Sequence, residues 1–120
     1  MTVLSLKTKI TTPRVAETIA WYRALFGLAE VEAWDQPGDK GSIFALPGGG
    51  NEALLEIYDG PTADFAGFSL QFRTDDLDGF HAAIAGRFES RGPINRAWGS
   101  RYLYLTDPNG ISIIIYEGGL

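Results

Sequence analysis

The chain has 120 residues, of which 45% are hydrophobic and 21% are charged, a composition that predicts one compact globular domain and excludes an intrinsically disordered chain. Its 15 acidic and 10 basic residues give a net charge of −5, so it lacks the basic surface that nucleic-acid binding requires, and without cysteine it cannot form disulfides or use a catalytic thiolate. No apolar stretch approaches the ~18 residues that cross a bilayer and the N-terminus carries no cleavable hydrophobic segment, so we expect a cytoplasmic protein with neither a membrane nor a nucleic acid as its partner.

The first part of the chain carries signals for a strand, a helix and three more strands. Apolar and polar residues alternate over 3–10, which predicts a strand with one polar face. Thr12-Pro13 offers an N-cap and a proline for the first helical position, and Gly27 offers a stop, so a helix is predicted over about 13–26. Three candidate strands follow, at about 30–34, 42–46 and 53–58. Turn-forming residues separate them, including Gly48-Gly49-Gly50, which predicts a hairpin loop.

The second part repeats this order after a linker at about 59–66. Phe68–Arg73 alternates and predicts a strand, and Asp75 is expected to cap a helix that runs to about Phe88. The chain ends in a predicted hairpin whose turn is Asp107-Pro108-Asn109-Gly110. The remaining strands are expected at about 94–98, 102–106 and 111–117.

The repeated order predicts an α+β fold built from two tandem βαβββ modules. Module 1 covers about 1–59 and module 2 about 66–120, and together they form one domain over 1–120 because neither alone could bury both its helix and its sheet. A ferredoxin-like arrangement ranks second, since it leaves the extra hairpins unexplained.

Strand alternation divides the predicted sheet residues between two faces. The apolar face, which the helices would cover, takes Leu4, Leu6, Ile10, Leu55, Ile57, Phe68, Leu70, Phe72, Leu103, Leu105, Ile111, Ile113 and Ile115. The opposite face takes Ser5, Lys7, Lys9, Leu54, Glu56, Tyr58, Ser69, Gln71, Arg73, Tyr102, Tyr104, Ser112, Ile114 and Tyr116. This mixed face is either solvated or curls around a ligand, and its tyrosines favour a partly apolar cavity.

Several segments, in this order, are similar to those of a known family. They are Trp21–Leu28, Leu54–Tyr58, Asp75–Asp78, Leu105–Gly110 and Ile111–Ile114. With the paired βαβββ pattern, they resemble the glyoxalase, bleomycin-resistance and extradiol-dioxygenase superfamily, also called vicinal oxygen chelate proteins, over nearly the whole chain. The resemblance implies a curled mixed sheet around a cleft, with the helices on its outer face.

The resemblance also locates the metal-ligand positions used by other members of that superfamily. Carried over, they fall at Lys7, Glu56, Ser69 and Ile114, and only Glu56 keeps a ligand type. A two-residue shift would bring in Lys9 or Gln71 without restoring a second carboxylate. We therefore expect no metal and no cofactor, and we expect Lys7 or Lys9 to neutralise Glu56, because an uncompensated buried carboxylate is unfavourable.

The predicted function is that of a metal-free, bleomycin-resistance-like homodimer that sequesters an aromatic, neutral-to-cationic small molecule. The predicted binding residues are Lys7, Trp34, Glu56, Tyr58, Ser69, Gln71, Trp98, Tyr102, Tyr104, Ile114 and Tyr116. No catalytic residue is predicted. One alternative is a glyoxalase- or dioxygenase-like enzyme of the same superfamily, with Glu56 as its acid or base, and another is a structural or regulatory dimer without a small ligand. His81 is expected on the solvent side of the second helix or packed against it.

Overall fold

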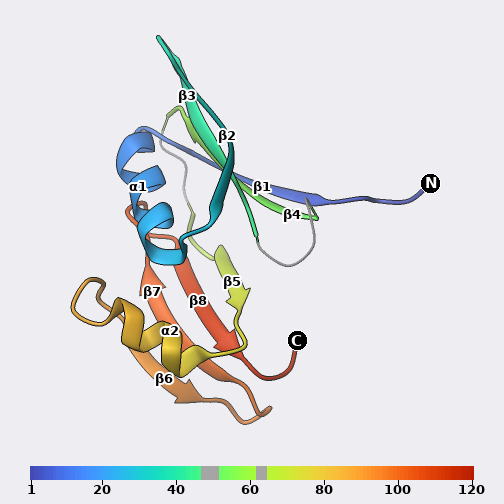
Figure 1. Ribbon diagram of the computed structural model, residues 1–120, viewed down its shortest axis with the longest axis vertical. Helices are drawn as coiled ribbons and strands as arrows, with labels where there is room; N and C mark the ends of the chain where they lie inside the picture. Colours follow the sequence, from blue (N-terminus) through green and yellow to red (C-terminus); the bar gives the residue numbers. More distant parts are fainter. Residues whose placement is uncertain (47–51, 62–64) are drawn as a thin grey trace. The chain divides into compact units, whose positions relative to one another are not determined.

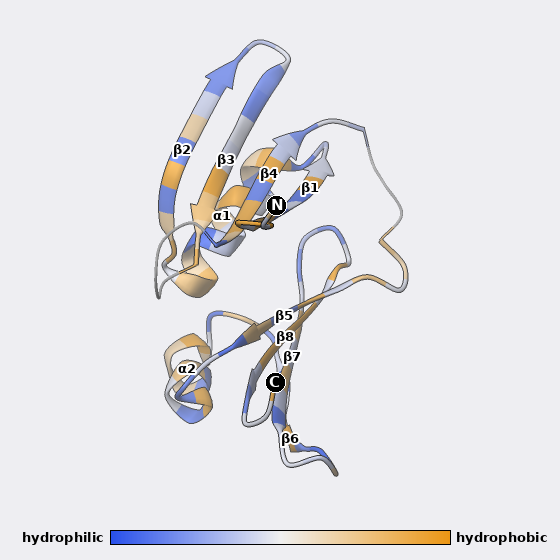
Figure 2. Cartoon of the chain, turned by 90° about the vertical axis from the view of Figure 1, so that its right-hand side faces the viewer, coloured by the Kyte–Doolittle hydropathy of each residue, from blue (hydrophilic) through white to orange (hydrophobic). Residues whose placement is uncertain are grey.

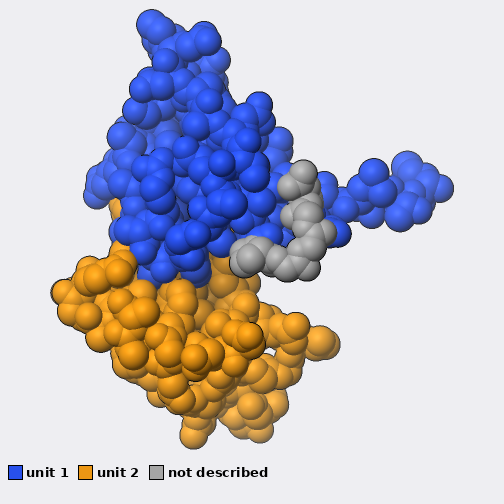
Figure 3. All heavy atoms as spheres, viewed as in Figure 1, with its two compact units in different colours: residues 1–64 blue, residues 65–120 orange. Residues whose placement is uncertain are grey.

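A computed structural model of the chain describes residues 1–46, 52–61 and 65–120. The chain divides into two compact units, Met1–Asp64 and Phe65–Leu120, shown in different colours in Figure 3. Each unit contains one helix and one four-stranded sheet (Figure 1). Among the described residues, neither helix has the length and apolar character that a membrane span needs.

The first unit follows the order strand, helix and three strands. Its elements are β1 (Leu6–Thr12), α1 (Val15–Phe26), β2 (Ala29–Gln36), β3 (Asp39–Ala45) and β4 (Ala53–Asp59). The spatial order is β1-β4-β3-β2, with β1 parallel to β4 and the other neighbours antiparallel.

The second unit repeats this topology. Its elements are β5 (Ser69–Arg73), α2 (Leu77–Ile84), β6 (Arg91–Asn95), β7 (Arg101–Thr106) and β8 (Ser112–Glu117). The order is β5-β8-β7-β6, again with one parallel pair, β5 and β8. The predicted α+β class and the two tandem βαβββ modules are therefore confirmed, and the strands form two four-stranded mixed sheets, one in each module.

Local side chains set the ends of both helices. Helix α1 begins at Val15, two residues later than predicted, because the Thr12 hydroxyl accepts a hydrogen bond from the Arg14 N–H at 3.0 Å and holds this segment as a turn. Gly27 ends α1 in the left-handed conformation, as predicted. In α2, the N-cap is Asp76 and not Asp75, since the Asp76 carboxylate accepts from the Gly79 N–H at 2.9 Å.

The core of each unit lies between its helix and one face of its sheet. In the first unit, Leu55 and Ile57 are buried on the side of β4 that α1 covers. In the second unit, alternate residues of β7 and β8 are buried under α2, namely Leu103, Leu105, Ile113 and Ile115. Hydrophilic and hydrophobic segments alternate along strands such as β2 and β4 (Figure 2), as expected for sheets with one covered face.

Three residues predicted for the apolar core are exposed instead. Leu4 and Leu6 are 81% and 70% exposed, and Phe68 is 40% exposed. Leu4 precedes β1, and Leu6 starts this edge strand, which pairs on one side only. Phe68 precedes β5 and contacts Phe65, with 6.3 Å between ring centroids. The predicted Gly48-Gly49-Gly50 loop and residues 62–64 of the predicted linker lie outside the described residues.

Candidate functional site

The open face of the first sheet is centred on Glu56 in β4. Strand register places Glu56 between Lys9 of β1 and Ile43 of β3. The Glu56 carboxylate is buried, and it lies 3.5 Å from the Lys7 Nζ and 3.9 Å from the Lys9 Nζ. The predicted neutralisation of Glu56 by these lysines is confirmed, so the carboxylate is already engaged by two ammonium groups.

A second cluster on this face joins Trp34, Tyr58 and Asp39. The Trp34 and Tyr58 rings lie 6.2 Å apart, and the Trp34 indole donates a hydrogen bond to the Asp39 carboxylate at 2.9 Å. A hydrogen bond from Tyr58 to the same carboxylate raises the pKa of Tyr58, because the phenolate would lose this bond and face a like charge. Lys9 lies 4.4 Å from the centre of the Tyr58 ring.

Gly41 makes this aromatic contact possible. It lies between Trp34 and Tyr58 in the strand register, and a Cβ atom there would come within 2.5 Å of the Trp34 ring. Asp39 was not predicted as a site residue, although its position two residues before Gly41 on β3 places it on the same face.

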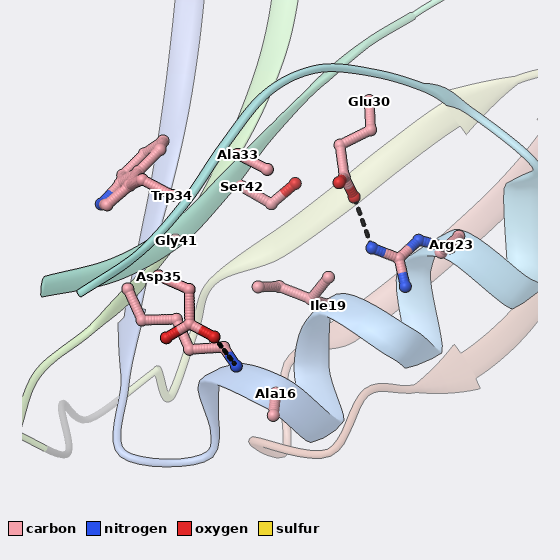
Figure 4. A pocket seen from close by; sticks show the side chains of 10 residues that line it. Ala16, Ile19, Arg23, Glu30, Ala33, Trp34, Asp35, Gly41 and Ser42 are labelled. Carbon is pink, nitrogen blue, oxygen red and sulfur yellow. Dashed lines mark hydrogen bonds and ion pairs between the residues drawn. The ribbon is translucent and has the colours of Figure 1, made fainter. Parts of the chain in front are cut away.

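An open pocket of about 390 Å³ lies on the other side of this sheet, between α1 and the β2–β3 hairpin (Figure 4). Its lining residues are Ala16, Ile19, Arg23, Glu30, Ala33, Trp34, Asp35, Lys40, Gly41 and Ser42. Ion pairs occupy its charged groups, since Arg23 pairs with Glu30 at 2.5 Å and Lys40 with Asp35 at 3.3 Å. The Trp34 ring points away from this pocket (Figure 4), so it belongs to the cluster on the open face.

The open face of the second sheet carries a continuous aromatic surface. Tyr102 of β7 is the centre, with its ring 5.7 Å from Tyr116, 6.0 Å from Tyr104 and 5.9 Å from Trp98. The three tyrosines are half-buried, and Trp98 is 65% exposed. This arrangement agrees with the predicted alternation, because the neighbouring β7 residues face α2. We call these four residues the aromatic surface.

The other three binding residues predicted for this face lie at one side of the aromatic surface. Ile114 is buried in β8, opposite Tyr104. Ser69 and Gln71 are exposed on β5, opposite Ser112 and Ile114 respectively. Strand alternation therefore places all three on the open face, but no ring or hydrogen bond links them to the tyrosines.

Two arginines that were not predicted lie over two tyrosines of the aromatic surface. The Arg91 guanidinium lies 4.3 Å from the centre of the Tyr104 ring, and that of Arg96 lies 5.1 Å from Tyr104 and 5.5 Å from Tyr102. The Arg96 Nε is buried without a hydrogen-bond partner. Arg91 pairs with Tyr104 across β6 and β7, so this strand pairing places Arg91 beside the tyrosine. Arg96 follows the end of β6, so no strand pairing indicates its position.

A second pocket, of about 410 Å³, opens beside Arg91. It is lined by Glu89, Ser90, Arg91, Tyr104, Leu105, Thr106 and Ser112. The lining therefore combines the Tyr104 ring and one guanidinium with three serine or threonine hydroxyls and one carboxylate. We call this space the Arg91 pocket.

The residues present do not fit the metal-ligand set that the resemblance implies. In the first unit, the only ligand-type side chain of the expected set is Glu56, and two ammonium groups surround it. In the second unit the corresponding residues are an exposed serine, Ser69, and a buried isoleucine, Ile114. Within 1–46, 52–61 and 65–120, no three His, Cys, Asp or Glu side chains cluster in a way that could hold a metal ion.

Sequence comparison assigns most of the chain to one family model. Residues 5–115 match the model of the Glyoxalase/Bleomycin resistance protein/Dioxygenase superfamily. No curated protein matches the sequence.

Solved structures with low sequence identity share the fold. A glyoxalase/bleomycin resistance protein from Catenulispora acidiphila DSM 44928 has 21% identity, with 98% of this chain and 100% of that chain covered and a TM-score of 0.73. TnmS3, an antibiotic binding protein from Streptomyces sp. CB03234, has 21% identity, coverage of 99% and 100%, and a TM-score of 0.74. The fosfomycin resistance protein FosX from Listeria monocytogenes, complexed with Mn(II) and sulfate, has 16% identity, coverage of 100% and 95%, and a TM-score of 0.73.

Proposed function

Because the chain belongs to the glyoxalase/bleomycin resistance protein/dioxygenase superfamily, we propose that it binds an aromatic small molecule, without a metal ion, on the open face of its second sheet. The observation that carries this proposal is the aromatic surface, in which Tyr102 contacts Tyr104, Tyr116 and Trp98 on the face that α2 leaves uncovered. One structural neighbour is named an antibiotic binding protein, which supports the same class of function.

Contact with the exposed parts of these rings contributes to the affinity in this proposal. An aromatic contact adds about 0.5–1.5 kcal/mol beyond the burial of apolar area. Ser90, Thr106 and Ser112 provide hydroxyls at the adjacent Arg91 pocket that would orient a ligand through hydrogen bonds. In this proposal Glu56 does not act as a general base, because two lysines of the first unit hold its carboxylate.

The net charge of the protein and the charges at the aromatic surface favour ligands of different charge. The net charge of −5 favours a neutral-to-cationic guest. On the aromatic surface, however, the guanidinium groups of Arg91 and Arg96 already occupy the cation–π positions over Tyr104 and Tyr102. A cationic guest would meet like charges there, so we do not retain the cationic part of that expectation.

We also propose that the protein acts as a cytoplasmic homodimer. The lack of cysteine fits a reducing compartment. Leu4 and Leu6, which are largely exposed at the N-terminal edge, offer apolar area for a symmetric contact. Sedimentation at micromolar concentration should give the mass of a dimer, and a monomer would contradict this part of the proposal.

A thermal-shift screen tests the binding function. A ligand at ten times its Kd adds about 1.4 kcal/mol to stability and raises the Tm by roughly 5 °C. We expect such shifts with aromatic compounds in the absence of divalent metal, and we expect Tyr102→Leu to abolish them. Tyr58→Leu is the matched control, because it removes a tyrosine from the open face of the other unit.

Two outcomes would refute the proposal. One is that no aromatic compound of the screen shifts the Tm, or that Tyr102→Leu shifts as much as the unmodified protein. The other concerns the metal: near-stoichiometric Zn, Mn, Ni or Fe in the purified protein that disappears in Glu56→Gln would contradict metal-free binding.

A further inference from the structure

We infer that the ligand of the second unit is an aromatic acid, whose carboxylate is held by Arg91 at the Arg91 pocket and attracted by Arg96 over Tyr104, while its ring lies against the aromatic surface. This inference rests on the proposed function and names the chemical class of its ligand. It is carried by the charges, hydrogen-bond donors and free volume that surround Tyr104.

The first observation is that both guanidinium groups lack an anionic partner. Over the described part of the chain, no carboxylate lies within 4.0 Å of Arg91 or Arg96. By contrast, Arg23 pairs with Glu30, and Arg101 pairs with both Asp78 and Glu117. Arg91 and Arg96 stack on tyrosines instead, which orders a guanidinium but leaves its in-plane N–H donors available.

The second observation is the buried Nε of Arg96, which has no hydrogen-bond partner. Buried donors in folded proteins are almost always paired, because an unmade hydrogen bond is costly in free energy. Because this Nε is shielded from solvent, a ligand oxygen would approach the Arg96 guanidinium through its terminal N–H donors. Arginine is suited to this role, since its planar fork of N–H donors matches the two oxygens of a carboxylate.

The third observation is the space beside Arg91. The Arg91 pocket, of about 410 Å³, falls within the range of ~300–1,000 Å³ typical of small-molecule sites. The hydroxyls of Ser90, Thr106 and Ser112 line it and can donate to carboxylate oxygens. Tyr104 forms part of both the pocket and the aromatic surface, so an acid group in the pocket places an attached ring next to Tyr102.

One residue of the pocket opposes an anion. The Glu89 carboxylate lines the same space as Arg91. If the ligand is an acid, this carboxylate weakens its binding, and neutralising Glu89 strengthens it. If the ligand is a cation, the opposite follows. Glu89 therefore distinguishes the two signs of charge.

Three probes with the same ring system test the charge preference directly. They are naphthalene-2-carboxylate, naphthalene-2-carboxamide and 2-naphthylmethylammonium, and their Kd values are measured by calorimetry on the full chain at low ionic strength. We expect the carboxylate to bind at least tenfold more tightly than the amide, and the ammonium compound to bind most weakly. Added salt should weaken the carboxylate and leave the amide unchanged.

Variants then assign the effect to the named residues. Arg96→Gln and Arg91→Gln should each weaken the carboxylate about tenfold with little change for the amide, and Glu89→Gln should strengthen the carboxylate. Arg14→Gln is the matched control, because it removes an exposed arginine of the first unit. Circular dichroism checks the folding of each variant, and the three-probe comparison on the unmodified protein does not depend on them.

The outcomes separate this inference from the proposed function. Equal Kd values for the three probes would overturn the aromatic-acid inference and leave aromatic binding intact. Tightest binding of the ammonium compound, or weaker carboxylate binding in Glu89→Gln, would overturn it in favour of a cation. Failure of all three probes to bind would overturn both.

Discussion

Removing both lysines around Glu56 should destabilise the protein by more than the sum of the two single changes. At an effective dielectric constant of about 20, charges separated by 3.5 or 3.9 Å attract by about 4–5 kcal/mol. The net value is smaller, because the lysine side chains are 47% and 49% exposed and solvent screens such pairs. Each of Lys7→Met and Lys9→Met should therefore cost about 0.5–1 kcal/mol, since one ammonium remains.

The double variant differs because it leaves the Glu56 carboxylate unpaired. This side chain is only 9% exposed, and a buried charge that loses its partners costs about 3–5 kcal/mol. Allowing for partial solvation once both lysines are gone, we expect a loss of about 2–4 kcal/mol in Lys7→Met/Lys9→Met. Adding Glu56→Gln to the double variant should restore at least half of this loss, since the uncompensated charge disappears.

Urea unfolding followed by tryptophan fluorescence measures these differences. With an m-value of about 1–3 kcal/mol per M, the double variant should shift the midpoint by about 1 M or more. Lys40→Met is the matched control, because its partner Asp35 is 73% exposed, and it should cost at most about 0.5 kcal/mol. A double variant that loses only the sum of the single losses, or that Glu56→Gln fails to rescue, would refute the argument.

Three further predictions concern individual residues. Asp76→Ala should lower the free energy of unfolding by about 1 kcal/mol, because it removes the N-cap of α2. Asp76→Asn should keep most of the stability, since asparagine also caps helices, and urea unfolding measures both changes. Gly41→Ala should displace the Trp34 ring and cost about 1–3 kcal/mol, and an unchanged tryptophan emission would contradict this. Arg101 lowers the pKa of Asp78 below its ordinary 3.8, so their pairing stabilises the fold above that value and is lost as the pH falls; Arg101→Gln should therefore flatten the decline of Tm below pH 4.

The features that local sequence determines were predicted well. Alternation in β7 and β8 correctly separated the residues under α2 from Tyr102, Tyr104 and Tyr116, because neighbouring strand residues must face opposite sides. The pairing of Lys7 with Glu56 was also predicted, since parallel neighbours on one face lie close together. These inferences needed only strand position and charge.

The features that depend on strand register or on loops were not predicted. The contact between Trp34 and Tyr58 requires β3 to place a glycine between them, and register in β2 shifts at a bulge between Glu30 and Glu32. Leu6 was assigned to the core by its alternation, but this pattern does not reveal that β1 is an edge strand. The Trp34–Tyr58 contact and the exposure of Leu6 both depend on which strands pair and in which register. Alternation within one strand does not reveal this pairing.

Arg96 shows why net charge does not describe the charge around the aromatic surface. A net charge of −5 averages over the whole surface, whereas a bound molecule interacts mainly with charges within a Debye length, about 8 Å at physiological ionic strength. Near Tyr104 those charges include two guanidinium groups, and the carboxylate of Glu89 lines the adjacent pocket. Because Arg96 lies in the loop after β6, strand alternation assigns it to neither face. Its position over the tyrosines therefore contributes to the local charge at the aromatic surface, which composition does not reveal.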